Sequence, residues 1–409
     1  MDDLIIRSDC IVTCKEDKNS EIIDGYISVA DGRIKNIVCG NVPLELPGRN
    51  IKYIDAIGKV VTPGLIDAHT HLIHSGSREN ELSMKLKGIS YLEILKMGGG
   101  ILSTVANTRK ASKEELKAKA RKSLDRMLVH GTTTIEAKSG YGLDFETEIR
   151  CLQAVAELNQ EHAIDIVRTY MGAHAVPEEY KGNTEGYMEL MINQVMPYIA
   201  QNNLAEFMDV FCEEGVFSPK ESRVLMEAGK RLGFKLKIHA DEIVPLQGAE
   251  LASEMGAVSA EHLLAASDAG IDAMRRAHVT AVLLPGTSFY LMLGKYAQAR
   301  KMIENGVRVA IATDYNPGSC PTEILQGIMT YACFGMKLLP EEIIKCMTLN
   351  AAYAVDRASE IGSIEIGKKA DLVIFDAPNL EYIIYHFGIN HVGKVVKNGK
   401  IVVENGNLI

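Results

Sequence analysis

The stretch Val61–Leu72, VTPGLIDAHTHL, ends an apolar run with two histidines separated by a single residue. Side chains on an extended backbone alternate between its faces, so His69 and His71 can turn their imidazole rings toward one point. A divalent metal held there would activate a water molecule, which makes hydrolysis the first reaction class to consider. Histidines at this spacing also occur as ordinary surface or core residues, and the rest of the chain must decide between these interpretations.

Size and charge narrow the classes of protein to which the chain can belong. Its 409 residues can bury a large core, and 44 basic against 53 acidic residues give a net charge of −9. This balance argues against nucleic acid as a partner. The eight cysteines form no CxxC pair, which favours reduced thiols in a cytoplasmic protein. We expect neither a signal segment nor a membrane span, because no apolar stretch is long enough.

The middle of the chain alternates apolar, strand-like runs with helical stretches. Eight candidate strands end near Asp67, Lys138, Gly172, Cys212, His239, His262, Pro285 and Asp314. Ser112-x-x-Glu115 and Ser218-Pro219-x-Glu221 predict capping boxes that begin helices through about residues 130 and 232. Eight strand–helix units predict an α/β fold, a (β/α)8 TIM-like barrel. A doubly wound open sheet is the alternative, but no GxGxxG motif follows the first strand.

Both ends of the chain are rich in short alternating strands. Residues 21–39 and 391–405 each suggest a strand pair, and Asn398-Gly399 is a strong signal for a type I′ hairpin. Residues 370–376 predict one further strand. We expect the two ends to meet in one small β-sandwich domain of residues 1–62 and 358–409, with residues 63–357 forming the barrel.

Polar residues gather at the predicted strand ends. In a barrel of parallel strands the carboxyl ends of all strands face one mouth, so residues distant in sequence converge there. The residues expected at this mouth are His69, His71, His174, His239, His262 and Asp314. Any one of them could instead be a hydrogen-bonded core histidine or a capping aspartate. Five of the eleven histidines at strand ends, however, favour a functional site more strongly than any single motif.

Longer motifs resemble the amidohydrolase superfamily and, more narrowly, its imidazolonepropionase family. VTPGLIDAHTH, histidines after the fifth and sixth strands and an aspartate after the eighth carry the wider resemblance, as does a β-sandwich made from both termini. The narrower resemblance covers nearly the whole chain and includes GSRENE (76–81), GISYLEIL (88–95), GGGILSTV (98–105), HGTTTIEAKSGYGL (130–143), YMGAHAVPEEY (170–180), LKIHADEI (236–243), LLPGTSFYL (283–291) and ATDYNPGSCPTE (312–323).

This resemblance implies an enzyme that hydrolyses 4-imidazolone-5-propanoate to N-formimino-L-glutamate in histidine degradation. It implies one Zn²⁺ or iron ion held by His69, His71, His239 and Asp314. Asp314 would accept a proton from water, His262 would stabilise the oxyanion, and Glu242 would protonate the leaving ring nitrogen. The implied substrate contacts are Arg78, Tyr141, His174, Glu242, Asn316, Gly318 and Ser319. A homodimer is also implied.

Two departures from the wider family pattern bear on the metal. Binuclear members usually carry a modified lysine at the end of the fourth strand, where this chain has Cys212-Glu213-Glu214, so a single ion is favoured over bridging by Glu213 or Glu214. His74 stands where an apolar or aromatic residue is expected, and a supporting or loop role is favoured over a ligand.

Other functions stay open at this point. The order His-Ala-Asp-Glu (239–242) is similar to the His-x-x-Glu of aminohydrolases, which deaminate purines or pyrimidines. A non-catalytic barrel used in assembly is a second alternative, although such a protein would normally have lost ligands. Without the resemblance, Arg78 would be taken for a surface partner of Glu79 or Glu81.

Overall fold

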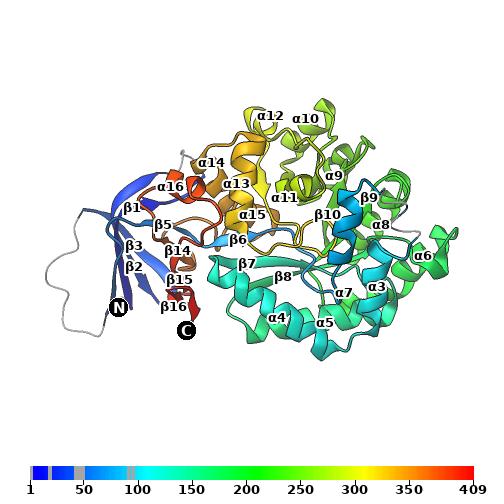
Figure 1. Ribbon diagram of the computed structural model, residues 1–409, viewed down its shortest axis with the longest axis horizontal. Helices are drawn as coiled ribbons and strands as arrows, with labels where there is room; N and C mark the ends of the chain where they lie inside the picture. The colour runs from blue at the N-terminus through cyan, green and yellow to red at the C-terminus, as the bar shows by residue number, and fades with distance from the viewer. Residues whose placement is uncertain (1–2, 17–20, 41–50, 90–92, 94–96) are drawn as a thin grey trace.

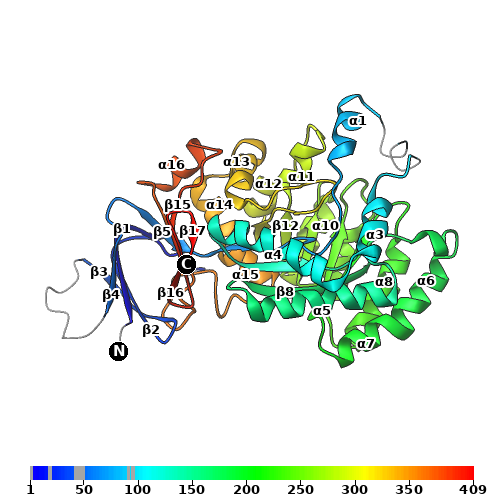
Figure 2. The ribbon, with the colours of Figure 1, turned by 60° about the horizontal axis from the view of Figure 1, so that its bottom comes forward.

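The computed structural model describes residues 3–16, 21–40, 51–89, 93 and 97–409, and these form two separate sheets. Figure 1 shows the strands of both termini at one end of the molecule and the barrel with its helices at the other. The view of Figure 2, turned by 60°, shows the same separation. Part of the motif at residues 88–95 lies outside the described residues.

Eight parallel strands form the barrel that the sequence predicts, and their order in the sheet is their order in the chain. They are β6 (Leu65–Asp67), β7 (Thr132–Lys138), β8 (Asp165–Ala173), β9 (Phe207–Cys212), β10 (Lys235–Ala240), β11 (Ser259–His262), β12 (Thr280–Leu283) and β13 (Val309–Ile311). Nearly every residue of these strands is buried, because helices cover the barrel outside and side chains fill it inside.

The barrel closes between its last and first strands near the mouth. The backbone N–H of Asp314 donates to the carbonyl of His69 at 3.1 Å, and that of His71 donates to the carbonyl of Tyr315 at 2.9 Å. Thr70 and Tyr315 form an isolated parallel bridge between these two bonds. The strand β13 ends before Asp314, so this aspartate lies in the following loop and not at the strand end. The closure thereby fixes Asp314 beside both histidines.

Helices cover the outside of the barrel and carry the predicted caps. Ser112 and Ser218 both form complete capping boxes, with Glu115 and Glu221. The helical elements are η1 (Glu79–Glu81), α1 (Leu82–Leu86), α3 (Ile101–Lys110), α4 (Lys113–Val129), α5 (Phe145–Glu161), η2 (Glu178–Tyr180), α6 (Thr184–Leu190), η3 (Met191–Val195), α7 (Met196–Gln201), α8 (Pro219–Arg231), α9 (Gly248–Met255), α10 (Asp268–Ala277), α11 (Pro285–Tyr290), α12 (Ala299–Glu304), α13 (Leu325–Met336), α14 (Pro340–Cys346), α15 (Leu349–Ala354) and α16 (Leu380–Tyr385). Among the described residues, no helix has the length and apolar character needed to cross a membrane.

Strands from both termini form one nine-stranded sheet, as predicted for the small β-domain. Its strands are β1 (Leu4–Val12), β2 (Ile22–Ala30), β3 (Arg33–Cys39), β4 (Lys52–Asp55), β5 (Val60–Pro63), β14 (Leu372–Phe375), β15 (Val392–Lys397), β16 (Lys400–Glu404) and β17 (Asn407–Leu408). The two ends join where β5 pairs antiparallel with β14. Asn398 and Gly399 both have positive φ at the predicted hairpin between β15 and β16. The division of the chain at residues 62 and 358 stays a prediction.

The interior of the barrel changes from apolar to polar toward the mouth. Its lower part is a cluster of apolar side chains that includes Ile66, Val167, Phe207, Val282 and Ala310. Charged side chains from β7, β9, β10 and β11 lie above this cluster, and the histidines follow at the strand ends. The packed apolar base and the polar layer above it support the residues at the strand ends from below.

Candidate metal centre

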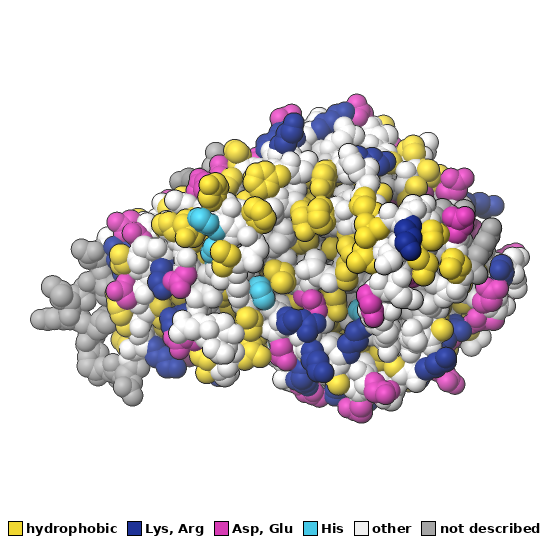
Figure 3. Space-filling view, viewed as in Figure 1, with side chains coloured by type: hydrophobic (Ala, Val, Ile, Leu, Met, Phe, Trp, Pro, Cys, Tyr) yellow, Lys and Arg dark blue, Asp and Glu magenta, His cyan; other side chains and the backbone are white. Residues whose placement is uncertain are grey.

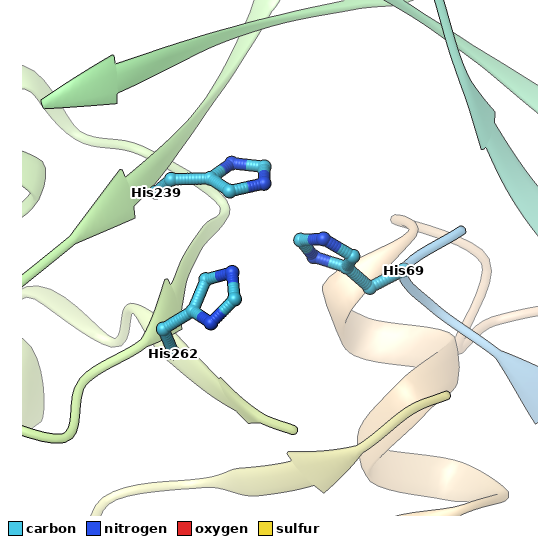
Figure 4. A group of neighbouring side chains, drawn as sticks. All are labelled: His69, His239 and His262. Carbon is cyan, nitrogen blue, oxygen red and sulfur yellow. The ribbon is translucent and has the colours of Figure 1, made fainter. Parts of the chain in front are cut away.

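Five histidines and one aspartate lie together at the mouth of the barrel. His69 and His71 follow β6, His239 lies in β10, and His262 ends β11. The ring centroids of His69 and His239 are 4.6 Å apart, and those of His239 and His262 are 5.1 Å apart. Figure 4 shows these three rings around one common space, His69 from one side and the other two from the strands opposite. Such convergence permits a single ion to contact several rings.

Asp314 completes the set of donor atoms around this space. Its Oδ1 lies 3.4 Å from Nε2 of His69 and 3.6 Å from Nε2 of His71. Two groups of possible ligands, with donor atoms within 4.8 Å of one another, share His69: one adds His71 and Asp314, the other His239 and His262. Three imidazoles and one carboxylate are typical donors for Zn²⁺ or iron.

The hydrogen bonding and protonation of the imidazole rings fit a bound metal ion. Within the described chain, Nε2 of His69 and Nε2 of His239 are buried without a hydrogen-bond partner. Buried polar atoms are nearly always paired, so two unpaired nitrogens on neighbouring rings fit a ligand that both rings share. Burial, with help from the Lys138 charge, holds the pKa of His69 well below its ordinary value. Burial likewise lowers the pKa of His71, so both rings are neutral and can offer a lone pair.

Two residues of the site have backbone conformations that only glycine adopts easily. Asp314 has φ 56° and His262 has φ 70°, both in the left-handed region. Such strain costs roughly 1–3 kcal/mol per residue and persists where the surroundings fix it. Two hydroxyl groups hold the Asp314 side chain in place. Thr287 Oγ1 donates to Oδ2 at 2.6 Å, and Ser319 Oγ donates to the same oxygen at 3.3 Å. Oδ2 is thereby occupied and Oδ1 faces the histidines.

Glu242 lies beside His262 in the loop after β10. Its Oε2 is 3.5 Å from Nε2 of His262. Burial, with help from the nearby Asp314 carboxylate, raises the pKa of Glu242 to about 8, so this side chain carries a proton near neutral pH. Glu213 supports the loop by accepting the backbone N–H of Ile243 at 2.8 Å. Among the described residues, neither Glu213 nor Glu214 belongs to a possible ligand group.

Arg78 is buried at the edge of the site and pairs with Glu81 through two hydrogen bonds of 2.9 Å. The alternative interpretation of Arg78 as a surface residue is therefore wrong, although Glu81 is one of the two partners that this interpretation named. Lys85, which sequence reasoning missed, lies 3.6 Å from Glu81 and donates to the carbonyl of Gly318 at 2.7 Å. Two cations thus flank the loop after β13.

Tyr141 and His174 line another side of the site. His174 stacks on His71 with ring centroids 4.8 Å apart, and Tyr141 lies 5.1 Å from His174. Burial lowers the pKa of His174 to about 3, so its ring is neutral. Sequence reasoning also missed Glu148, whose buried carboxylate accepts the backbone N–H groups of Gly140, Gly142 and Leu143. This carboxylate fixes the loop that carries Tyr141.

The loop after β13 is held by Asn316. Its Oδ1 accepts the backbone N–H groups of Gly318 and Ser319, both at 2.8 Å, and its Nδ2 donates to the carbonyl of Asp314.

His74 lies behind His71, and its Nδ1 is 2.9 Å from the carbonyl of His71. His74 is in none of the possible ligand groups of the described residues, which agrees with a supporting role behind His71.

Comparisons with known sequences give the class of this barrel. A model of the amidohydrolase family matches residues 60–402, so the chain belongs to that family of hydrolases. Within the family it belongs to the imidazolonepropionases. It is 61% identical over 389 residues to the imidazolonepropionase of Alkaliphilus oremlandii, covering 95% of this chain and 92% of the relative. It is 59% identical over 405 residues to that of Treponema denticola, covering 98% of each.

Solved structures share the fold at low sequence identity. The atrazine chlorohydrolase TrzN from Arthrobacter aurescens TC1, complexed with zinc, aligns with a TM-score of 0.76 at 17% identity over 99% of this chain and 96% of its own. The 5-methylcytosine deaminase from Klebsiella pneumoniae aligns with a TM-score of 0.75 at 17% identity over 99% of each chain. These likenesses confirm the predicted barrel with a separate sheet from the termini.

Proposed function

We propose that this protein hydrolyses 4-imidazolone-5-propanoate to N-formimino-L-glutamate, the ring opening by which imidazolonepropionases act in histidine degradation. The relatives that bear this name are 61% and 59% identical over nearly the full chain. One observation of the structure carries the proposal: Asp314 of the buried histidine centre begins the loop of Gly318, and the buried guanidinium of Arg78 packs against that glycine. A hydrolytic centre beside a cation suits a cyclic amide that bears a carboxylate.

We infer that His69, His71, His239 and Asp314 hold one Zn²⁺ or iron ion. The unpaired Nε2 atoms of His69 and His239 support this, as does the zinc in a solved structure of the same fold. An ion bound there would supply Lewis-acid chemistry, lowering the pKa of a water molecule and polarising the substrate carbonyl.

The protein's own groups then move the protons. Asp314 accepts the proton of the attacking water on Oδ1, because Thr287 and Ser319 already occupy Oδ2. His262 stands at the mouth to stabilise the developing oxyanion. Glu242 carries a proton near neutral pH and can give it to the ring nitrogen that leaves.

The propanoate tail explains the remaining contacts. Arg78 presents a planar guanidinium, which suits bidentate binding of a carboxylate, and Glu81 fixes its orientation. Tyr141 and His174 form the wall beside His71 on which the ring would rest. Asn316 Oδ1 accepts the backbone N–H groups of Gly318 and Ser319, and these two hydrogen bonds fix the loop that would lie beside the tail.

A direct assay tests the proposal. Purified protein with imidazolonepropanoate should yield formiminoglutamate, and Asp314→Asn should remain folded and lose activity. Metal analysis should find about one ion per chain. Release of ammonia from guanine or cytosine, without ring opening of imidazolonepropanoate, would favour the deaminase alternative instead. Nearly two ions per chain would contradict the single-ion centre and would favour Glu213 or Glu214 as a ligand that bridges two ions.

We also propose a cytoplasmic homodimer. Figure 3 shows hydrophobic side chains gathered in a band across one face, over the region that carries α13 and α16 in Figure 1. Large apolar side chains exposed in this region include Phe334, Tyr385 and Phe387, which are 66%, 75% and 67% exposed. Exposed apolar patches of this kind often mark association surfaces. Light scattering on the purified protein should give twice the mass of the chain, and the mass of one chain would contradict the dimer.

A further inference from the structure

Five charged side chains lie in the barrel directly beneath the proposed metal centre. Three are acidic and two are basic: Glu136, Lys138, Asp209, Lys237 and Glu261. All five are buried, with at most 1% of each residue exposed. Burying charges is costly, and replacing a buried ion pair by apolar residues is often neutral or stabilising. Since the lower barrel is filled by apolar side chains, the fold does not by itself require charges here.

The two lysines connect the three carboxylates into one layer. Nζ of Lys138 lies 2.7 Å from Asp209, 2.8 Å from Glu136 and 4.0 Å from Glu261. Nζ of Lys237 lies 3.3 Å from Glu136 and 3.5 Å from Glu261. With two positive and three negative groups, the layer carries a net charge of −1. A net negative layer favours a divalent cation in the centre above it.

Two carboxylates of this layer contact histidines of the centre from behind. Nδ1 of His69 hydrogen-bonds to Oε2 of Glu261. Nδ1 of His239 lies 3.1 Å from Oδ2 of Asp209, a contact that lacks the linear geometry of a hydrogen bond. A neutral imidazole has one N–H, so a carboxylate at Nδ1 keeps the proton there and leaves the Nε2 lone pair for a ligand. In the described part of the chain, Nε2 of His69 and Nε2 of His239 are indeed buried without a hydrogen-bond partner.

We propose that Glu261 and Asp209 are positioning residues for the metal, fixing the tautomer and orientation of His69 and His239, and that Lys138 holds both carboxylates in place. Lys138 contacts both carboxylates, so it couples a ligand that follows β6 to a ligand in β10. This inference rests on the proposed metal site, although it does not depend on which substrate is hydrolysed.

The same layer argues against a second ion below the first. His69, Glu136 and Glu261 form a third group of possible ligands by distance. The ammonium groups of Lys138 and Lys237 lie 2.8 Å to 4.0 Å from these two carboxylates and already neutralise them. A second dication there would have to displace or repel two buried positive charges, and the layer therefore supports one ion.

Zinc affinity of the metal-depleted full chain tests the proposal. Competition with a chromophoric chelator would give the Kd for Zn²⁺ of the wild type and of Glu261→Gln, Asp209→Asn and Lys138→Met. Loss of such supporting groups typically weakens metal binding by about 10- to 100-fold. Glu261→Leu should weaken binding more than Glu261→Gln, because glutamine can still accept from Nδ1. The absorption bands of bound Co²⁺ should shift in the same variants, which a purely structural role would not produce.

A buried ion pair in the terminal sheet provides the matched control. Lys397 lies 2.6 Å from Asp371, and their side chains are 2% and 3% exposed. Asp371→Asn therefore removes an equally buried carboxylate and should leave the Kd for Zn²⁺ within about twofold of the wild type. Wild-type affinity in folded Glu261→Gln and folded Lys138→Met would overturn the proposal. If one of these fails to fold, Asp209→Asn decides alone by the same criterion.

The outcomes separate this proposal from the proposed function. Tight zinc binding that weakens in the three variants, without hydrolysis of imidazolonepropanoate, would support the positioning layer and contradict the substrate. A wild-type chain that binds no zinc, iron or cobalt would overturn both the metal site and its positioning layer.

Discussion

A Cβ atom on Gly318 would lie 2.1 Å from Nη1 of Arg78, so the guanidinium occupies the space that any other residue would need. The two residues come from opposite ends of the barrel sequence and meet because β13 closes against β6. The constraint on this glycine comes from the close approach and not from its φ angle, because a side chain here would force the guanidinium to move. The observed position of the Arg78 guanidinium therefore depends on the absence of a side chain at residue 318.

The first prediction is that Gly318→Ala raises KM for the carboxylated substrate about tenfold or more, with little change in kcat. The added methyl group displaces the guanidinium that binds the tail and leaves the centre intact, which is the signature of lost uniform binding. Steady-state kinetics measure both values. Gly327→Ala is the matched control, because a Cβ at Gly327 meets nothing within 4 Å. A wild-type KM in Gly318→Ala would contradict the role of Arg78.

The second prediction concerns the pair that orients Arg78. Arg78→Ala should raise KM sharply, and Glu81→Gln should raise it by a smaller factor, roughly three- to tenfold, because one charge-assisted bond of the pair is lost. Glu79→Gln removes a neighbouring carboxylate that is exposed and pairs with Ser77, so it should leave KM unchanged. Equal KM values for the variants at residues 79 and 81 would show that orientation of Arg78 does not matter.

The third prediction concerns Thr287, which holds Oδ2 of Asp314 at 2.6 Å. A hydrogen bond to a charged group contributes about 1.5–3 kcal/mol, so Thr287→Val should lower kcat by roughly 10- to 100-fold while KM changes little. Ser288→Ala is the neighbouring control, since the described residues include no hydrogen-bond partner for that hydroxyl. An unchanged kcat in Thr287→Val would mean that the strained loop alone orients Asp314.

Much of the fold could be predicted because its signals are local. The capping boxes at Ser112 and Ser218 and the hairpin at Asn398-Gly399 depend on neighbouring residues, and all three are confirmed. The strand ends follow from short apolar runs, so the order of residues alone was enough to place the histidines that follow them at one mouth.

The remainder depends on contacts between distant strands. Glu136 and Lys138 stand two residues apart in β7, and Lys237 stands two residues before His239 in β10. Side chains two apart on a strand share a face, so this spacing was a usable signal for the barrel interior. Which carboxylate meets which lysine depends on the register of the barrel, which no local pattern gives. The approach of Gly318 to Arg78 and the positive φ of Asp314 likewise follow from closure of the barrel.

The last prediction uses Lys119 of α4, a half-buried lysine that donates to the carbonyl of Gly76 at 2.5 Å. Burial lowers its pKa to about 8, from an ordinary value near 10.5. Between these two values the unfolded chain binds a proton that the folded chain does not, so the stability contribution of this residue rises with pH. Below pH 8 both states are protonated, and the cost of burying the charge is fully present.

Lys119→Met should therefore remove a pH-dependent gain of stability. The melting temperature of the wild type minus that of the variant should rise between about pH 8 and pH 10.5 and stay flat from pH 6 to 7.5. The gain is on the order of 1 kcal/mol, because solvent still reaches this side chain and reduces the effect. Lys122→Met removes an exposed lysine from the same helix and controls for the change in net charge. A difference that falls as pH rises would show that the ammonium of Lys119 stabilises the fold.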